Sequence, residues 1–168
     1  LVGVLLGDGH LETQDQGRSY RLKIEHSSKQ KEYADWLYQE FKEWVQTPPQ
    51  ARSRYVKLRS VEGTYEKYWF NTLSSGSFRF YAQQFYKKSG KKIVPRLIHR
   101  WLTPLALAIW YMDDGSIKSN AHTTVLFNTQ GFDAMSLKYL QKTLQEKFGL
   151  KTKLRKQKLS KATGSMRC

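Results

Sequence analysis

The sequence has one cysteine, Cys168, and it is the last of the 168 residues. A single cysteine excludes a disulfide framework and a cysteine zinc site, and it suits a reducing compartment. No phosphate-binding P-loop and no paired Cys/His zinc spacing occurs either. The longest apolar run, Leu105–Met112, is far too short to span a bilayer. These absences exclude disulfide-rich secreted domains, zinc fingers, P-loop proteins and membrane-spanning proteins.

Acidic residues are also scarce. The chain has 14 Asp and Glu against 29 Lys and Arg, a net charge of +15, which points to a polyanionic partner. The excess is steepest in residues 116–168, with 11 basic and 2 acidic residues. A membrane surface would attract such charge, but no long basic helix with a clean apolar face is present. A nucleic acid is therefore the favoured partner, and 168 residues can bury one core.

Two apolar helical runs end in Asp-Gly. They are Leu1–Gly9 (LVGVLLGDG) and Leu105–Gly115 (LALAIWYMDDG), and a shift of 106 residues places Asp8 on Asp114. One such run is typical of an ordinary buried helix that stops at a glycine. Two copies at one spacing indicate a repeated functional element.

The aspartates at these helix ends are unfavourable in a purely structural part. A helix C-terminus carries partial negative charge, so each carboxylate there costs roughly 0.3–1 kcal/mol. If the two helices pack side by side, Asp8 and Asp114 also repel each other, and a bound divalent cation would offset both penalties. Gly3 and Gly7 share one helix face and would let the partner helix approach closely, whereas the second run has Ile109 and Asp113 there.

Hairpins and amphipathic helices alternate along the rest of the chain. Strict alternation in Arg18–His26 gives that strand one apolar and one polar face. The expected hairpins are His10–Thr13 with Arg18–His26, Ser53–Val61 with Glu66–Thr72 around the turn Glu62–Thr64, and Ser116–Ser119 with His122–Gln130. The expected helices are Lys29–Val45, Phe78–Lys88, Arg96–Leu102 and Asp133 to just before Gly149, followed by a strand at Lys151–Lys158.

Apolar stripes on two of these helices are interpreted as core. In Lys29–Val45 the stripe is Tyr33, Trp36, Leu37, Phe41, Trp44 and Val45, with stacking on nucleic acid as the minor alternative. In the last helix it is Leu137, Leu140, Leu144 and Phe148. The four histidines, His10, His26, His99 and His122, are scattered and are interpreted as structural or surface groups.

The two Asp-Gly runs resemble the paired signature helices of the LAGLIDADG homing endonucleases, in their single-chain, two-repeat, intron-encoded omega-type form. WLTPLALAIWYMDDG (101–115), LFNTQGF (126–132) and KKIVP (91–95) add to the resemblance. It implies an α+β fold of two pseudo-symmetric αββαββα repeats, residues 1–103 and 104–168, the second incomplete. The repeats would pack through the paired helices, and antiparallel sheets would form a DNA-binding saddle.

The resemblance also implies an activity, that of a site-specific double-strand DNA endonuclease that hydrolyses phosphodiester bonds with Mg²⁺ or Mn²⁺. It implies that Asp8 and Asp114 are catalytic and bind the metal. Asp113 ranks second because it aligns with a glycine of the first run. Lys92, with Lys91 as the fallback, looks like the basic residue that supports the phosphate or the attacking water.

The polar sheet faces are expected to hold a long recognition site in duplex DNA, bound by a monomer. Strand alternation selects Arg21, Lys23, Lys57, Arg59, Lys118, Lys153 and Arg155 as DNA-binding residues. The alternative function is an intron-splicing maturase, or a remnant that binds RNA or DNA without cutting. The resemblance favours an organelle, the mitochondrion or the chloroplast.

The second repeat has less sequence than the first. After the strand at Lys151–Lys158 it lacks the second hairpin partner, the following helix and the second basic turn that residues 10–92 supply. We therefore expect part of the stripe on the last helix to be exposed, and the 168-residue chain to nick DNA at most. The sequence starts inside the first signature helix without Met, so we expect residues before Leu1, where a targeting signal would lie.

Overall fold

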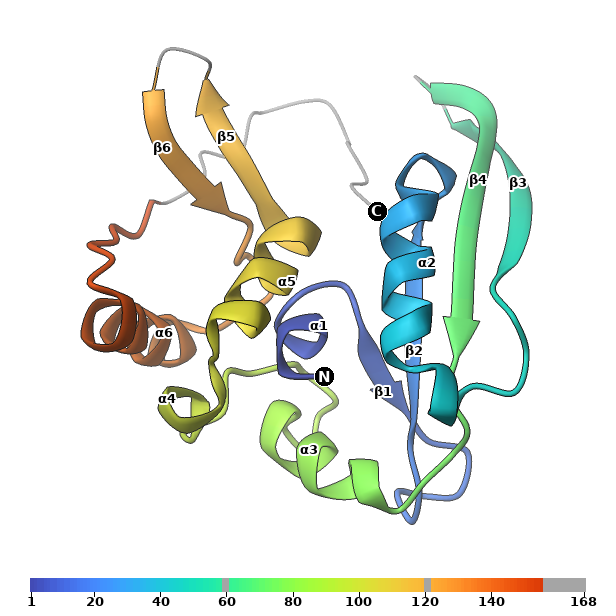
Figure 1. Ribbon diagram of the computed structural model, residues 1–168, viewed down its shortest axis with the longest axis horizontal. Helices are drawn as coiled ribbons and strands as arrows, with labels where there is room; N and C mark the ends of the chain where they lie inside the picture. Colours follow the sequence, from blue (N-terminus) through green and yellow to red (C-terminus); the bar gives the residue numbers. More distant parts are fainter. Residues whose placement is uncertain (59–60, 120–121, 156–168) are drawn as a thin grey trace.

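The computed structural model describes residues 1–58, 61–119 and 122–155, and it places two antiparallel sheets on either side of two central helices (Figure 1). The helices are α1 (Val2–Leu6), α2 (Lys31–Glu40), α3 (Ser77–Phe85), α4 (Ile98–Trp101), α5 (Pro104–Asp114) and α6 (Ala134–Phe148), with short 3-10 helices η1 (Ser28–Gln30) and η2 (Lys42–Trp44). The strands are β1 (His10–Glu12), β2 (Arg21–Ser27), β3 (Gln50–Leu58), β4 (Val61–Asn71), β5 (Gly115–Ser119) and β6 (His122–Phe127). None of the helices in these ranges has the length and apolarity that crossing a membrane requires.

The central pair is α1 and α5, the two signature helices. A Cβ added at Gly3 would lie 2.8 Å from Ile109 Cβ and 3.0 Å from Ala106 Cα, and one added at Gly7 would lie 2.7 Å from Asp113 Cγ. These pairs also show that α1 and α5 run in the same direction, so both helices end at the same side of the molecule. The predicted close approach at the two glycines is confirmed, and it brings the Asp-Gly ends together.

Replacing Gly3 by alanine is therefore expected to lower the free energy of unfolding by about 1–3 kcal/mol, because the new methyl group meets the α5 backbone, which has no room to yield. Urea denaturation measures the change. Gly131→Ala is the matched control, since nothing lies within 4 Å of a Cβ at that position. An equal loss in both variants would show that the close contact between α1 and α5 at Gly3 and Gly7, here called the glycine seam, is not the cause.

The first sheet has the strand order β1-β2-β4-β3, and α2 covers its inner face. The predicted alternation in β2 is confirmed: Leu22, Ile24 and His26 are buried, and the residues between them are half-buried. Ile24 faces Phe70 of β4 across the ladder, and Leu37 of α2 is fully buried. The inner face, α2 and the two signature helices thus enclose one core.

The helix predicted at Lys29–Val45 is shorter than expected. It ends at Glu40, and η2 continues the chain with a different twist, so the apolar stripe does not stay on one face. Trp36 and Trp44 are each 40% exposed, which makes the core prediction wrong for these two rings. They lie at the rim, where Trp36 stacks on Tyr33 with ring centres 6.2 Å apart.

The turn predicted at Glu62–Thr64 is wrong, because these residues belong to β4. Val56 pairs with Gly63, and the ladder continues to the pair Leu58–Val61; residues 59–60 lie outside the described part. The turn prediction relied on the conformational freedom of Gly63. That freedom is not used, since Gly63 is not among the glycines with positive φ.

The second repeat contains the β5-β6 hairpin and α6. Asp133 caps α6 by accepting a hydrogen bond from Ser136 N (2.9 Å), and Gly149 ends it with φ of +67°, both as predicted. Leu140 and Leu144 are buried, and Leu137 and Phe148 are half-buried, so the stripe is exposed only in part. The reason is that α4 packs against α6 and supplies part of the missing cover.

The strand predicted at Lys151–Lys158 is not formed over residues 151–155, which are exposed and have no regular secondary structure. A strand is stabilised by its ladder, and among the described residues β5 and β6 pair only with each other. The remaining residues of that prediction, 156–158, lie outside the described ranges. The order αββα of the second repeat, and αββαββα of the first, is as predicted.

Candidate active site at the ends of the paired helices

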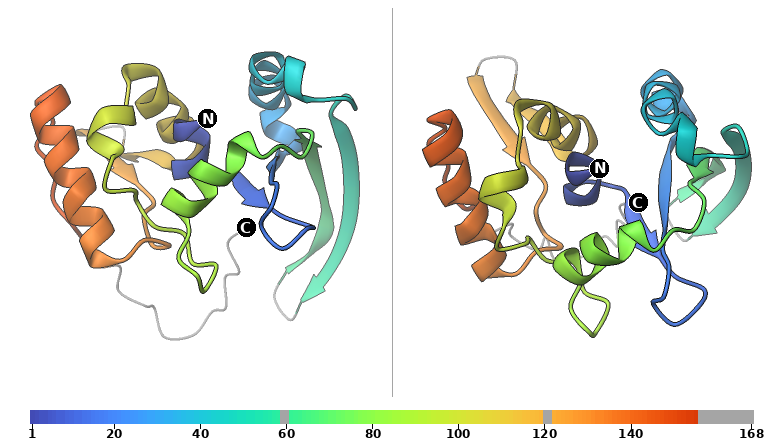
Figure 2. Two further views of the ribbon diagram at one scale, coloured as in Figure 1. Left: turned by 90° about the horizontal axis from the view of Figure 1, so that it is seen from below. Right: turned by 60° about the horizontal axis from the view of Figure 1, so that its bottom comes forward.

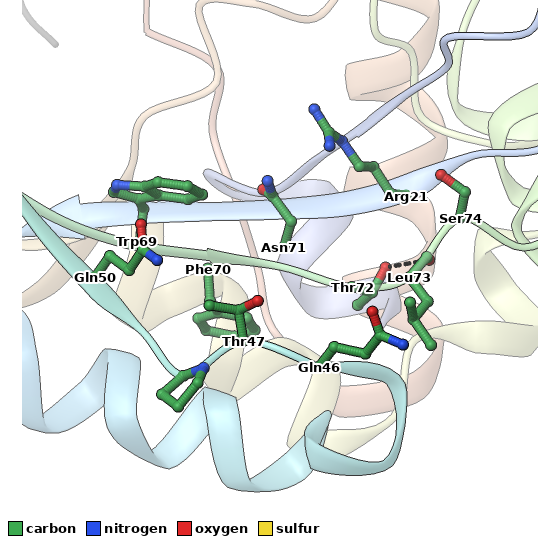
Figure 3. Close-up of a pocket in the computed structure, with 11 residues that line it drawn as sticks. Arg21, Gln46, Thr47, Gln50, Trp69, Phe70, Asn71, Thr72, Leu73 and Ser74 are labelled. Carbon is green, nitrogen blue, oxygen red and sulfur yellow. Dashed lines mark hydrogen bonds between the residues drawn. The ribbon is translucent and has the colours of Figure 1, made fainter.

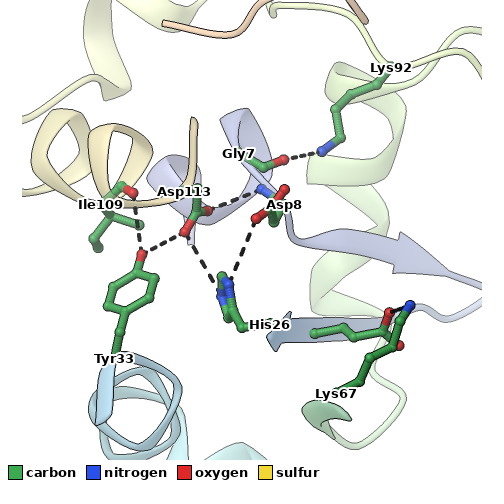
Figure 4. A network of polar contacts seen from close by, with 9 residues as sticks. Gly7, Asp8, His26, Tyr33, Lys67, Lys92, Ile109 and Asp113 are labelled. Atoms are coloured by element: carbon green, nitrogen blue, oxygen red, sulfur yellow. Dashed lines mark hydrogen bonds and ion pairs between the residues drawn. The ribbon is translucent and has the colours of Figure 1, made fainter. Parts of the chain in front are cut away.

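A hydrogen bond from the backbone of one to a side chain of the other joins the Asp-Gly ends of α1 and α5. Asp8 N donates to Asp113 Oδ2 at 3.1 Å (Figure 4). Because Gly7 has no side chain, the Asp113 carboxylate fits against the end of α1. The Asp113 side chain is fully buried, whereas that of Asp8 is 48% exposed and open to a ligand.

His26, at the end of β2, lies between the same two carboxylates. Its Nδ1 is 3.7 Å from Asp8 Oδ2 and its Nε2 is 3.9 Å from Asp113 Oδ1, and its side chain is 1% exposed. Burial lowers the pKa of His26, and the nearby Asp8 opposes this shift. Sequence reasoning assigned His26 no role here. The signal was available, because alternation after Leu22 and Ile24 places residue 26 on the inner face.

Tyr33 of α2 holds Asp113 from the other side. Its hydroxyl donates to Asp113 Oδ1 at 2.7 Å and lies 3.3 Å from Ile109 O. Burial raises the pKa of Tyr33, and the nearby Asp113 raises it further, so the phenol keeps its proton. The sequence predicts Tyr33 as a core residue only. A helix stripe does not reveal that its first member reaches the end of another helix.

Lys92 supports the end of α1. Its Nζ donates to the carbonyl oxygens of Gly7 and Gly9, each at 2.8 Å, on either side of Asp8. Burial lowers the pKa of Lys92, and the three aspartates oppose that shift. Lys91, the fallback in the sequence analysis, is exposed.

Asp114, the second predicted catalytic aspartate, is fixed through its backbone. Asn128 donates to the Asp114 carbonyl oxygen from its backbone N (2.9 Å) and from Nδ2 (3.1 Å). Burial raises the pKa of Asp114 to about 6, and repulsion from Asp8 adds to the shift. Asn128 belongs to the segment LFNTQGF, so this motif of the sequence holds the end of α5.

All three carboxyl groups have raised pKa values. Burial raises the pKa of Asp113 to about 7, while the hydrogen bonds from Tyr33 and Asp8 N work against the shift. Burial also raises the pKa of Asp8, against the charges of His26 and Lys92. The site therefore holds more carboxylates than its cations neutralise.

The donor set fits a divalent cation. One ligand atom each from Asp8, His26 and Asp113 lies within 4.8 Å of the others, and Nδ1 of His26 has no hydrogen-bond partner among the described residues. Carboxylate oxygens suit Mg²⁺ and Mn²⁺, and an added imidazole nitrogen suits transition metals. The resemblance put Asp8 and Asp114 first, whereas the tightest cluster contains Asp113, which sequence reasoning ranked second.

The outer face of the first sheet is basic. Arg21 and Lys23 lie on it, and the register adds Arg52, Arg54 and Lys67, which the sequence analysis missed. Arg21 Nε pairs with Glu12 at 2.7 Å, and Lys67 pairs with Glu25. The other two arginines are exposed and have no acidic partner in the described ranges.

The other predicted DNA-binding residues are placed differently. Lys57 pairs with Glu62 in the ladder, and alternation puts it on the opposite face of the sheet from Arg52 and Arg54. Arg59 and the side chain of Lys118 lie outside the described part. Lys153 and Arg155 are exposed, but on a segment that is not a strand.

A recess of about 350 Å³ lies between the end of β4 and the segment that leads into β3 (Figure 3). Its polar lining comes from both sides of the gap, with Arg21 and Asn71 above and Gln46 below in this view. The Asn71 Oδ1 atom has no hydrogen-bond partner among the described residues. Its full lining is Arg21, Gln46, Thr47, Pro48, Gln50, Trp69, Phe70, Asn71, Thr72, Leu73 and Ser74.

Residues 1–166 match the LAGLIDADG DNA endonuclease family over both signature helices and both sheets. The chain belongs to that family. It is 30% identical over 165 residues to DNA endonuclease I-ChuI of Chlamydomonas applanata, covering 95% of this chain and 76% of the relative. It is 31% identical over 164 residues to the cytochrome b mRNA maturase bI2 of Saccharomyces cerevisiae, covering 93% of this chain and 37% of the maturase.

A solved structure supports the LAGLIDADG fold. The homing endonuclease I-WcaI bound to its DNA recognition sequence matches with a TM-score of 0.82 at 24% identity, covering 94% of this chain and 69% of that one. This match confirms the α+β architecture expected from the sequence, and the family match over residues 1–166 confirms the expected family. The repeat boundaries, 1–103 and 104–168, stay predictions.

Proposed function

We propose that this LAGLIDADG protein acts as a site-specific double-strand DNA endonuclease in intron homing, with one aspartate for each strand. The observation that carries the proposal is the glycine seam, which brings Asp8 and Asp114 to one end of two parallel helices beside Lys92. Incubating the full reading frame with intronless target DNA and Mg²⁺ tests it. Linear product is expected, and intact DNA at stoichiometric enzyme contradicts the proposal.

The residues of the site would have different roles at the phosphate. Asp8 and Asp114, with His26 and Asp113 beside Asp8, would hold a divalent cation, Mg²⁺ or Mn²⁺, which when bound neutralises phosphate charge and lowers the pKa of water. Lys92 keeps the two carbonyls beside Asp8 in place and adds positive charge next to the phosphate. Tyr33 holds Asp113 through a hydrogen bond, and Asp113 in turn holds the backbone of Asp8, with His26 packed beside both carboxylates.

We assign the DNA to the outer face of the first sheet. Arg52→Gln together with Arg54→Gln is expected to weaken duplex binding and to reduce the log–log salt slope by about 1.8, near 0.9 for each phosphate that the protein no longer neutralises. Fluorescence anisotropy across a salt series measures both effects. Lys57→Gln is the control and should change neither, because it lies on the other face. A larger effect from Lys57 would reverse the assignment of faces.

The second candidate is a maturase that binds intron RNA. It is favoured by relatives that are named cytochrome b mRNA maturases, in Saccharomyces cerevisiae and in Debaryomyces hansenii. Either function fits a monomer in an organelle. A splicing assay with the host intron separates the two, since an endonuclease without maturase function leaves splicing unchanged.

A further inference from the structure

A second basic region lies outside the site and the first sheet's outer face. Between Glu66 and Asp113 the sequence has no acidic residue, although it has eight lysines and arginines there. Lys67 belongs to β4 and Lys92 to the active site. The others lie on or around α3 and α4, so these helices form a locally uncompensated basic surface.

Aromatic rings lie at the centre of that surface. Phe80 and Tyr81 of α3 meet Trp101 of α4 in a three-ring cluster, with centroids 5.6–5.8 Å apart. Phe80 is 48% exposed, and the other two rings are half-buried. The cluster joins the two helices and leaves a large aromatic edge in solvent.

Three arginines lie within five residues of the rings in the chain. Arg79, Arg96 and Arg100 are exposed, and in the described part of the chain none has an acidic partner. By contrast, Lys87 nearby pairs with Asp133 at 2.7 Å. The arginines are thus free to bind an external anion.

The surface lies away from the aspartates. Trp101 precedes the first residue of α5, whereas Asp113 and Asp114 end it. At 1.5 Å per residue the 11 residues of α5 separate the two by about 16 Å. Figure 2, which views the molecule from below, shows α3 on this side, where the N-terminal ends of α1 and α5 also lie.

Exposed rings interleaved with unpaired arginines suit unpaired bases. Aromatic side chains and guanidinium planes stack on splayed bases, and arginine also neutralises phosphate. Duplex DNA keeps its bases stacked and offers such rings no partner, and the four residues of α4 are too short to fill a major groove. We propose that Phe80, Trp101, Arg79, Arg96 and Arg100, the α3–α4 surface, bind RNA through unpaired bases.

This proposal gives the second candidate function a surface of its own, and it does not depend on DNA cleavage. The test measures the anisotropy of a fluorescein-labelled, unstructured oligoribonucleotide of about 20 nucleotides. Arg79→Gln with Arg100→Gln should weaken RNA binding about tenfold and leave duplex binding unchanged. Arg52→Gln with Arg54→Gln removes the same charge from the sheet and should do the reverse.

Two further measurements separate stacking from charge. Phe80→Ala should weaken RNA binding about tenfold without changing the salt slope. If the alanine variant does not fold, Phe80→Leu replaces it, because leucine keeps more of the packing but cannot stack on a base. Duplex DNA should not displace bound RNA. The proposal is overturned if both arginine pairs weaken RNA binding equally, if duplex displaces the RNA, or if the α3–α4 pair weakens duplex binding instead.

Discussion

Asp8→Asn or Asp114→Asn is expected to abolish double-strand cleavage by the full reading frame while leaving DNA affinity within about tenfold. Binding is spread over many phosphate and base contacts, whereas the chemistry depends on two carboxylates at the helix ends. Each substitution removes the charge that holds a cation without changing the size of the side chain. Plasmid linearisation and gel shift on the same preparation measure the two effects separately.

Glu32→Gln is a suitable control for these variants. It removes one negative charge from an exposed position in the first turn of α2, where no contact with the three aspartates is made, and should leave both assays unchanged. Nicking without linearisation by one aspartate variant would show that each carboxylate serves one strand. Full cutting by either variant would end the assignment of the active site.

Asp113→Asn is expected to stabilise the metal-free protein at pH 8 and to have a smaller effect at pH 5. The Asp113 carboxyl has its pKa raised from 3.8 to about 7, so the folded state binds its proton more tightly than the unfolded state. The native stability therefore falls as the pH rises from about 4 to about 7. Asparagine removes that loss, which is worth roughly 2–4 kcal/mol for a shift of this size.

The asparagine can keep both hydrogen bonds. Its amide oxygen can accept from Asp8 N, and its amide group can donate to the hydroxyl oxygen of Tyr33, whose proton then goes to Ile109 O. Urea denaturation in EDTA at both pH values tests the prediction. Added Mg²⁺ should shrink the advantage of the variant, because a bound cation offsets the same repulsion.

Asp133→Asn provides a control of opposite sign. The Asp133 carboxylate accepts hydrogen bonds from Lys87 and Ser136, which hold its pKa below the usual range, so it stabilises the fold above its unfolded pKa. Its replacement should lower stability at pH 8. If both variants shift stability in the same direction, the raised pKa of Asp113 is not the cause.

Local patterns predicted much of this molecule. The seam followed from glycines four residues apart, because a missing side chain on a helix face has one simple structural use. The strand alternation around Leu22 and the cap at Asp133 followed in the same way. Each of these depends on residues close together in the chain.

The parts that failed depend on pairing between distant segments. Alternation placed Lys57 on one face of its strand, but only the ladder with β4 shows that Arg52 and Arg54, and not Lys57, lie with Arg21 on the outer face. His26 and Tyr33 became site residues because the end of β2 and the first turn of α2 lie beside the end of α5, a contact between segments far apart in the sequence. Asp113 lost rank by aligning with Gly7, yet that glycine is what makes room for it.

The glycine seam is asymmetric, because its glycines are on α1 and the larger side chains are on α5. This asymmetry also fixes the stoichiometry of the two halves. Two copies of the first half would set Gly3 against Gly3 and Gly7 against Gly7, leaving a hollow at the axis of an isologous dimer. Two copies of the second half would set Ile109 against Ile109 and Asp113 against Asp113, and these side chains would clash. Only the pairing of a first half with a second half fills the space between the helices. The single chain therefore corresponds to a heterodimer, and neither half can take the place of the other.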